Sequence, residues 1–182
     1  MTTTDFSTEP AWRLSRVAAG TAGALALAGV LSGLLVYLAR SPDRGPVPGT
    51  SAWLPHLVLA AVGALWLLVV VIRHRRGARL LLAPLGRRAT ARLAATFRTG
   101  GFGPTAMLRR LGSGLLVVVM AYGCWRTGLQ VTGGLDPNFT ANAWGGPSYL
   151  GAMFCHYVDG AWFFGVSAAL LNLLLVRPRR LV

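Results

Sequence analysis

Long runs of apolar residues dominate the chain. Four of them, at residues 17–39, 53–72, 112–131 and 150–176, contain at most one charged side chain each. A helix of about 20 mostly apolar residues spans the hydrocarbon core of a bilayer. The pattern therefore predicts an all-α membrane protein, in which residues 1–182 form a single membrane domain with four transmembrane helices. The first run is too long, and too poorly followed by a cleavage site, for a signal peptide.

The polar residues between these runs carry an uneven charge. The chain has 18 basic residues, all arginine, and 5 acidic ones, and ten arginines lie within residues 73–111. By the positive-inside rule, this basic loop and both termini are expected in the cytoplasm, with outer loops at 40–52 and 132–149. This placement explains the net charge of +13 without a nucleic-acid partner.

Composition narrows the protein class further. Only 13% of the residues are charged and 54% are hydrophobic, whereas soluble domains carry about 25% charged residues. This excludes an ordinary cytosolic enzyme. A chain whose basic residues are all arginine, and which is rich in Ala, Leu and Val, is typical of a bacterium of high genomic GC content. We therefore expect a multi-pass protein of the bacterial cytoplasmic membrane.

One part of the basic loop shows a helical pattern. Leu85, Ala89, Leu93 and Phe97 recur every four residues, and three arginines lie between them: Arg87, Arg88 and Arg92. The spacing predicts a short basic amphipathic helix on an anionic inner leaflet. Docking of this helix to a partner protein is the alternative.

The two predicted hairpins resemble each other in order. Each has a small residue followed by Gly-Leu, then a loop proline, a histidine, an apolar run and an arginine. The matched positions are Ser32 to Leu34 with Thr127 to Leu129, Pro42 with Pro137, His56 with His156, and Arg73 with Arg177. A duplication would give two pseudo-repeated hairpins in a four-helix bundle; a chance match stays open. The first span, with Gly29 and Gly33, is also suited to close helix packing.

Two histidines are the leading candidates for chemistry. His56 and His156 lie within about two turns of the outer ends of two spans that run in the same direction. Two imidazoles at equal depth on facing helices are what a bis-histidine haem needs, and Gly63 and Gly160 on the same spans would let the ring approach. The alternative is a pair of interfacial histidines hydrogen-bonded to backbone or water.

A polar cluster is predicted within the outer half of the spans. Asp159 lies three residues after His156 and shares its helix face, and a membrane carboxylate should face protein or water. We expect an ion pair between Arg126 and Asp159, with Gln130 available for hydrogen bonds across helices. Arg126 beside a haem propionate, and a proton path through Asp159 and His156, are alternatives.

The remaining features are two cysteines and an outer loop. Cys124 and Cys155 are expected to be buried free thiols, although a disulfide is open. The loop at 132–149, with four glycines, two prolines and three aromatic residues, predicts an ordered cap.

These features together resemble a known family. Four spans with both ends inside, His56 and His156 near the outer ends of the second and fourth spans, and the small-Gly-Leu endings are similar to the membrane cytochrome b subunits of formate dehydrogenase and related hydrogenases. The resemblance implies haem b between His56 and His156, electron transfer, and assembly with redox-complex subunits. The family's inner haem is not implied, because the first span has no histidine and the fourth carries Leu170 in the relevant region. Residues 156–162 also resemble a seven-residue stretch of cytochrome oxidase subunit III.

The sequence thus leaves three hypotheses. The first is a b-type cytochrome or electron-transfer membrane anchor with one outer haem. The second is a cofactor-free accessory or scaffold subunit of a membrane complex. The third is a small transporter with the polar cluster on its pathway. A stand-alone enzyme is not favoured, because no phosphate-binding loop, metalloprotease motif or nucleophile elbow is present.

Overall fold

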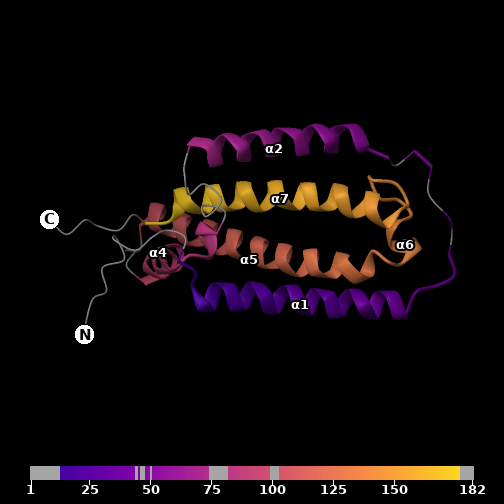
Figure 1. Cartoon of the computed structure of the whole chain (residues 1–182). Coiled ribbons are helices and arrows are strands. Elements are labelled where there is room, and N and C mark those ends of the chain that lie inside the picture. Colours follow the sequence, from indigo (N-terminus) through magenta and orange to yellow (C-terminus); the bar gives the residue numbers. More distant parts are fainter. Residues whose placement is uncertain are drawn as a thin grey trace. The chain divides into compact units, whose positions relative to one another are not determined.

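The computed structural model describes residues 13–43, 45, 48–49, 51–73, 82–98 and 103–176. Its elements, in chain order, are α1 (Arg16–Leu38), α2 (Trp53–Arg73), the 3-10 turn η1 (Ala83–Leu85), α4 (Arg87–Arg98), α5 (Pro104–Gly133), α6 (Pro137–Thr140) and α7 (Tyr149–Leu174) (Figure 1). The described residues form no strand, and Leu14 and Gly86 make an isolated β-bridge. Arg177, the last match of the predicted repeat, lies outside the described residues, as do positions 74–81 and 99–102 of the basic loop.

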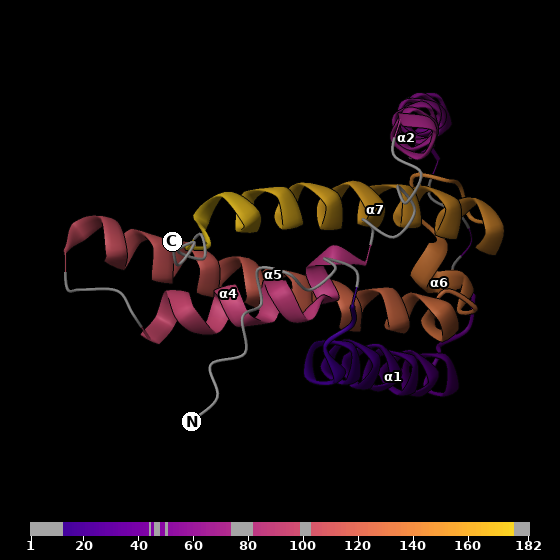
Figure 2. The ribbon, with the colours of Figure 1, turned by 60° about the vertical axis from the view of Figure 1, so that its left-hand side comes forward.

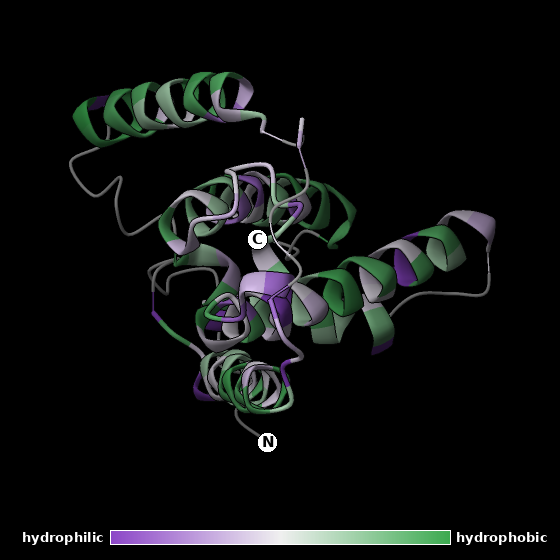
Figure 3. Cartoon of the chain, turned by 90° about the vertical axis from the view of Figure 1, so that its right-hand side faces the viewer, coloured by the Kyte–Doolittle hydropathy of each residue, from purple (hydrophilic) through white to green (hydrophobic). Residues whose placement is uncertain are grey.

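Four of these helices are long and apolar enough to cross a membrane, namely α1, α2, α5 and α7. Figure 3 shows hydrophobic residues along the long helices, and large apolar side chains such as Leu54 and Leu150 are 73% and 79% exposed. Such exposure is expected where lipid replaces water, because an apolar side chain then gains nothing by turning inward. The length and apolar composition of these four helices confirm the prediction of an all-α membrane protein.

The third span begins earlier than the hydropathy pattern predicted. Helix α5 starts at Pro104 rather than residue 112, so residues 104–111 are helical and not part of the basic loop. Pro104 is suited to a first helical position, where its missing N–H costs nothing. Arg109 and Arg110 lower the local hydropathy, so the sequence pattern did not indicate that the helix extends back to Pro104. The fourth span ends at Leu174, slightly before the predicted residue 176.

The chain divides into two compact units, each with parts of the four long helices. The first unit comprises residues 1–21, 67–119 and 166–182, and the second comprises 22–66 and 120–165.

In the first unit, α4 covers the C-terminal end of α7. The Arg92 guanidinium donates hydrogen bonds to the side-chain and backbone oxygens of Asn172, and to the carbonyls of Leu175 and Val176 at 3.0 and 3.1 Å. Thr96 Oγ1 accepts from the Val176 N–H at 3.1 Å. The last carbonyls of a helix have no partner within it, so Arg92 satisfies groups that lipid cannot. Arg92 therefore binds the end of α7, and its contact with anionic lipid stays a prediction from the sequence.

Helix α4 also lies beside the start of α5 (Figure 2). Arg110 Nε donates to the Thr96 carbonyl at 3.4 Å. Phe97 packs over Gly114, where an added Cβ would lie 3.7 Å from its ring. The predicted amphipathic helix thus exists, and part of its surface packs on α5 and α7.

In the second unit, α1 and α5 approach closely. A Cβ added at Gly29 would collide with the Trp125 carbonyl, and one at Gly128 with the Ala26 carbonyl. Thr132 Oγ1 donates to the Val30 carbonyl across this contact at 2.7 Å. The absence of side chains is what lets the two backbones meet, as the glycines of the first span predicted.

Candidate functional site

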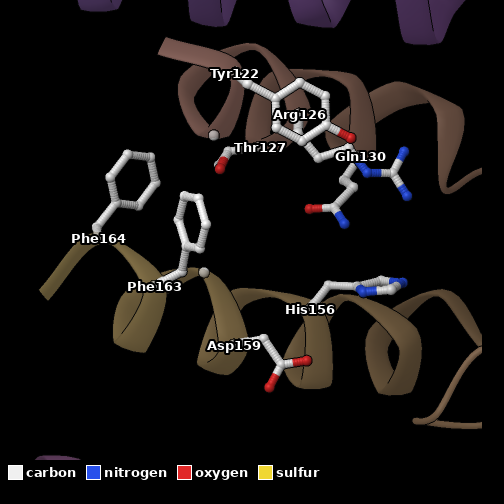
Figure 4. A pocket seen from close by; sticks show the side chains of 10 residues that line it. Tyr122, Arg126, Thr127, Gln130, His156, Asp159, Phe163 and Phe164 are labelled. Atoms are coloured by element: carbon white, nitrogen blue, oxygen red, sulfur yellow. The ribbon is translucent and has the colours of Figure 1, made fainter. Parts of the chain in front are cut away.

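The candidate site lies in the second unit, between α5 and α7. A cavity of about 210 Å³ separates the two helices there (Figure 4). Its polar lining consists of Arg126, Thr127, Gln130, His156 and Asp159. Tyr122, Phe163 and Phe164 form an aromatic wall.

Helical spacing brings these side chains together. Tyr122, Arg126 and Gln130 are four residues apart on α5, so they share one face. His156, Asp159 and Phe163 do the same on α7, at spacings of three and four. The structure therefore gathers the four predicted polar residues at one cavity, and it adds an aromatic wall that the sequence interpretation missed. The four-residue spacing of Tyr122 from Arg126 was the signal that could have found it.

His56 connects α2 to α7. Its Nδ1 lies 2.7 Å from the Ala52 carbonyl oxygen, and its Nε2 lies 3.3 Å from Oδ2 of Asp159, at the long end of hydrogen-bond range. The residue is only 3% exposed, whereas the Asp159 side chain is 39% exposed. The Trp144 ring lies over the imidazole, with ring centroids 5.5 Å apart. His56 is thus held on three sides by the protein.

The hydrogen-bond partners of His56 fix the orientation of its ring. A carbonyl oxygen only accepts, so Nδ1 donates to Ala52. Nε2 then faces the Asp159 carboxyl group across the contact between α2 and α7.

The expected ion pair between Arg126 and Asp159 does not form. Of the described residues, Asp159 pairs with His56, and in Figure 4 its carboxyl group points away from Arg126. The Arg126 guanidinium instead lies 5.1 Å from the ring centroid of Phe139. The loop between α5 and α7 folds back and brings the Phe139 ring to α5, while α2 supplies His56 to Asp159.

Gln130 and His156 face the cavity without a protein partner. Gln130 is 5% exposed, and its side-chain amide makes no hydrogen bond within the described part of the chain. His156, on the opposite wall, likewise has no hydrogen bond to another described residue. Figure 4 shows the Gln130 amide directed into the space between the helices. Both side chains therefore keep their hydrogen-bonding groups open toward the cavity.

The loop between α5 and α7 is an ordered cap over this unit. Asp136 Oδ1 accepts from the Asn138 N–H at 2.9 Å and caps α6, and Thr140 Oγ1 donates to the Pro147 carbonyl at 3.0 Å. Asn138 Nδ2 reaches the Ser41 carbonyl at 3.0 Å in the other outer loop. The ordered cap predicted from its composition is thus what the structure has.

The arrangement of the histidines does not fit a bis-histidine haem. An axial ligand needs a free imidazole nitrogen, and both nitrogens of His56 are engaged with Ala52 and Asp159. His56 is also not part of the cavity that His156 lines. At about 210 Å³, the cavity is smaller than the roughly 300 Å³ at which drug-sized sites begin. Haem binding stays a prediction from the sequence, and no chemistry is derived through it.

The glycines and cysteines predicted near the histidines also bear on whether the site fits a haem or a metal ion. Gly63 packs on Trp162, whose ring would lie 3.7 Å from an added Cβ, so it does not open space beside His156. Gly160 lines the cavity and has open space at its Cα. Cys124 and Cys155 are both free thiols. In the described residues, no three His, Cys, Asp or Glu side chains are grouped to hold a metal ion.

Comparison with protein-family models, with curated proteins and with solved structures finds no match to this chain. The resemblance to the cytochrome b subunits therefore stays a prediction from topology and a few residues.

Proposed function

We propose that the chain is a multi-pass accessory subunit of a membrane complex, without haem, with both termini in the cytoplasm. The observation that carries this proposal is the engagement of both His56 ring nitrogens inside the protein. A histidine that joins two spanning helices has a structural role, and interhelical hydrogen bonds are a main source of helix association in lipid.

The other contacts support the same role. Close backbone approach of α1 to α5 and the hydrogen-bonded outer cap stabilise the helices without a cofactor. The distribution of arginines supports the cytoplasmic placement of the basic loop. Contact of the basic helix α4 with anionic lipid, which its arginines predict, is part of this proposal.

The test of this proposal is an absorbance measurement on the whole chain. The protein is expressed in a bacterium supplied with 5-aminolaevulinate, so that haem synthesis does not limit loading, and purified in mild detergent. The dithionite-reduced minus air-oxidised spectrum is expected to be flat. A reduced α-band that disappears in both His56→Ala and His156→Ala would overturn the proposal and establish the cytochrome.

The accessory role needs a second measurement. Native electrophoresis of gently solubilised source membranes is expected to place the chain in an assembly larger than its 19.3 kDa mass, together with other subunits. Migration of the whole population as the single chain in its detergent micelle would contradict that role.

A further inference from the structure

Three polar side chains without a hydrogen bond to the described protein converge on the cavity between α5 and α7. They are Arg126, Gln130 and His156. Gln130 is the most informative, because the residue is only 5% exposed and its amide, which reaches the open space of the cavity, has no hydrogen bond to a described residue. A ligand that enters this space can therefore bond the amide directly.

Arg126 is a cation without an ion-pair partner among the described residues. Asp159, the acidic residue of the lining, is paired with His56 and points away from Arg126. The Arg126 Cζ lies over the Phe139 ring, 5.1 Å from the ring centroid, and no described residue accepts a hydrogen bond from its guanidinium. The N–H groups are therefore available to a ligand. These donors and the positive charge of Arg126 together favour an anionic ligand with planar acceptor geometry, which a carboxylate has.

The far end of the cavity is apolar. Phe163 and Phe164 meet edge to face, with centroids 5.9 Å apart, and Tyr122 completes this wall from α5. The cavity has a volume of about 210 Å³. The space suits a small molecule with one polar end and one apolar end.

We propose that this cavity binds a small carboxylate with an apolar body, its head at Arg126, Gln130 and His156 and its body against the aromatic wall. The carboxylate oxygens accept from the guanidinium and from the Gln130 amide N–H. Two classes of ligand fit this description: an aromatic acid that enters from water and a short fatty acid that enters from the membrane. Both present a carboxylate head and an apolar body to the site.

The test is ligand binding to the full chain in nanodiscs, with empty nanodiscs as the reference for partition into lipid. Benzoate and octanoate are titrated and followed by saturation-transfer NMR. Saturable binding of at least one acid is expected, and a preference for one of the two identifies the body. Benzyl alcohol, which keeps the ring and lacks the anion, is expected to bind at least about tenfold more weakly.

Two variants assign the binding to this cavity. Arg126→Gln is expected to weaken carboxylate binding about tenfold or more, because a charged hydrogen bond contributes about 1.5–3 kcal/mol. Gly160→Leu places a side chain in open space, removes no native contact and is expected to abolish binding. Gly160→Leu still tests the proposal if Arg126→Gln fails to fold.

The matched control is Arg40→Gln, because Arg40 also lies over a ring, 4.1 Å from the centroid of Tyr37, and lines no part of this cavity. It should bind like the wild type. The proposal is overturned if neither acid binds saturably to the folded wild type, if benzyl alcohol binds as tightly as the acids, or if Gly160→Leu binds them unchanged.

Discussion

Nε2 of His56 on α2 lies 3.3 Å from Oδ2 of Asp159 on α7, although the two residues are 103 positions apart in the chain. This contact takes the place of the ion pair between Arg126 and Asp159 that the sequence favoured. It joins α2 to α7 within the second unit, beside the cavity that Asp159 also lines.

The first prediction concerns the energy of this pair. His56→Ala and Asp159→Ala are each expected to lower the free energy of unfolding by about 1–2 kcal/mol, since each leaves a polar group without its partner. The 39% exposure of Asp159 keeps the cost below that of a fully buried ion pair. The measurement is reversible unfolding in mixed micelles.

The double variant, with His56→Ala and Asp159→Ala together, separates this contact from unrelated effects. Its decrease in the free energy of unfolding should be smaller than the sum of the two single decreases by at least about 0.5 kcal/mol, which is the coupling expected of residues in contact. Strict additivity would show that the pair contributes nothing as a pair.

A second prediction follows from the contact of α1 with α5. Gly29→Ala should destabilise the chain by about 1–3 kcal/mol, because the added Cβ collides with the Trp125 carbonyl and the helices must separate. Gly20→Ala on the same helix meets nothing within 4 Å. It should be neutral or stabilising, as alanine is the better helix former. Equal effects of the two substitutions on thermal unfolding would contradict the close-packing account.

The fold could be predicted from the sequence because each span carries its own signal. Apolar runs near 20 residues identify transmembrane helices without knowledge of any tertiary contact. The start of α5 at Pro104 could not be read this way, because Arg109 and Arg110 interrupt the apolar run while the backbone continues as a helix. The boundary depends on helix geometry and on the packing of α4.

The site was predictable in part. Intramembrane Arg126, Gln130, His156 and Asp159 were identified because polar groups are costly in lipid, and the cavity does contain all four. Their partners were not predictable, because pairing depends on helix rotation. A rotation of α7 decides whether Asp159 faces α2 or α5, and neither spacing nor depth specifies it. The carbonyl of Ala52 and the ring of Phe139 carry no sequence signal for these contacts.

A third prediction concerns Ser113 on α5. It is fully buried, and its Oγ has no hydrogen-bond partner among the described residues. Ser113→Ala removes that unsatisfied oxygen and is expected to leave stability unchanged or raise it by up to about 1 kcal/mol. Ser32→Ala should lower stability, because Ser32 Oγ donates to the Ala28 carbonyl and accepts from Trp125 Nε1. Melting temperatures of the two variants in one detergent test this, and a larger loss from Ser113→Ala would contradict it.

The last prediction concerns Arg92 and the end of α7. One guanidinium satisfies the carbonyls of Asn172, Leu175 and Val176, three acceptors that otherwise have no helical partner. Arg92→Gln should therefore increase hydrogen exchange locally, at the amides of the last turn of α7, more than tenfold. Arg92→Lys should not restore protection, because a single ammonium lacks the planar fork that reaches several oxygens at once. Arg88→Gln, one turn earlier on α4, is the charge-matched control and should leave exchange at α7 unchanged. If Arg88→Gln and Arg92→Gln raised exchange equally, the effect would be one of general charge at the membrane surface, and the capping of α7 by Arg92 would be contradicted.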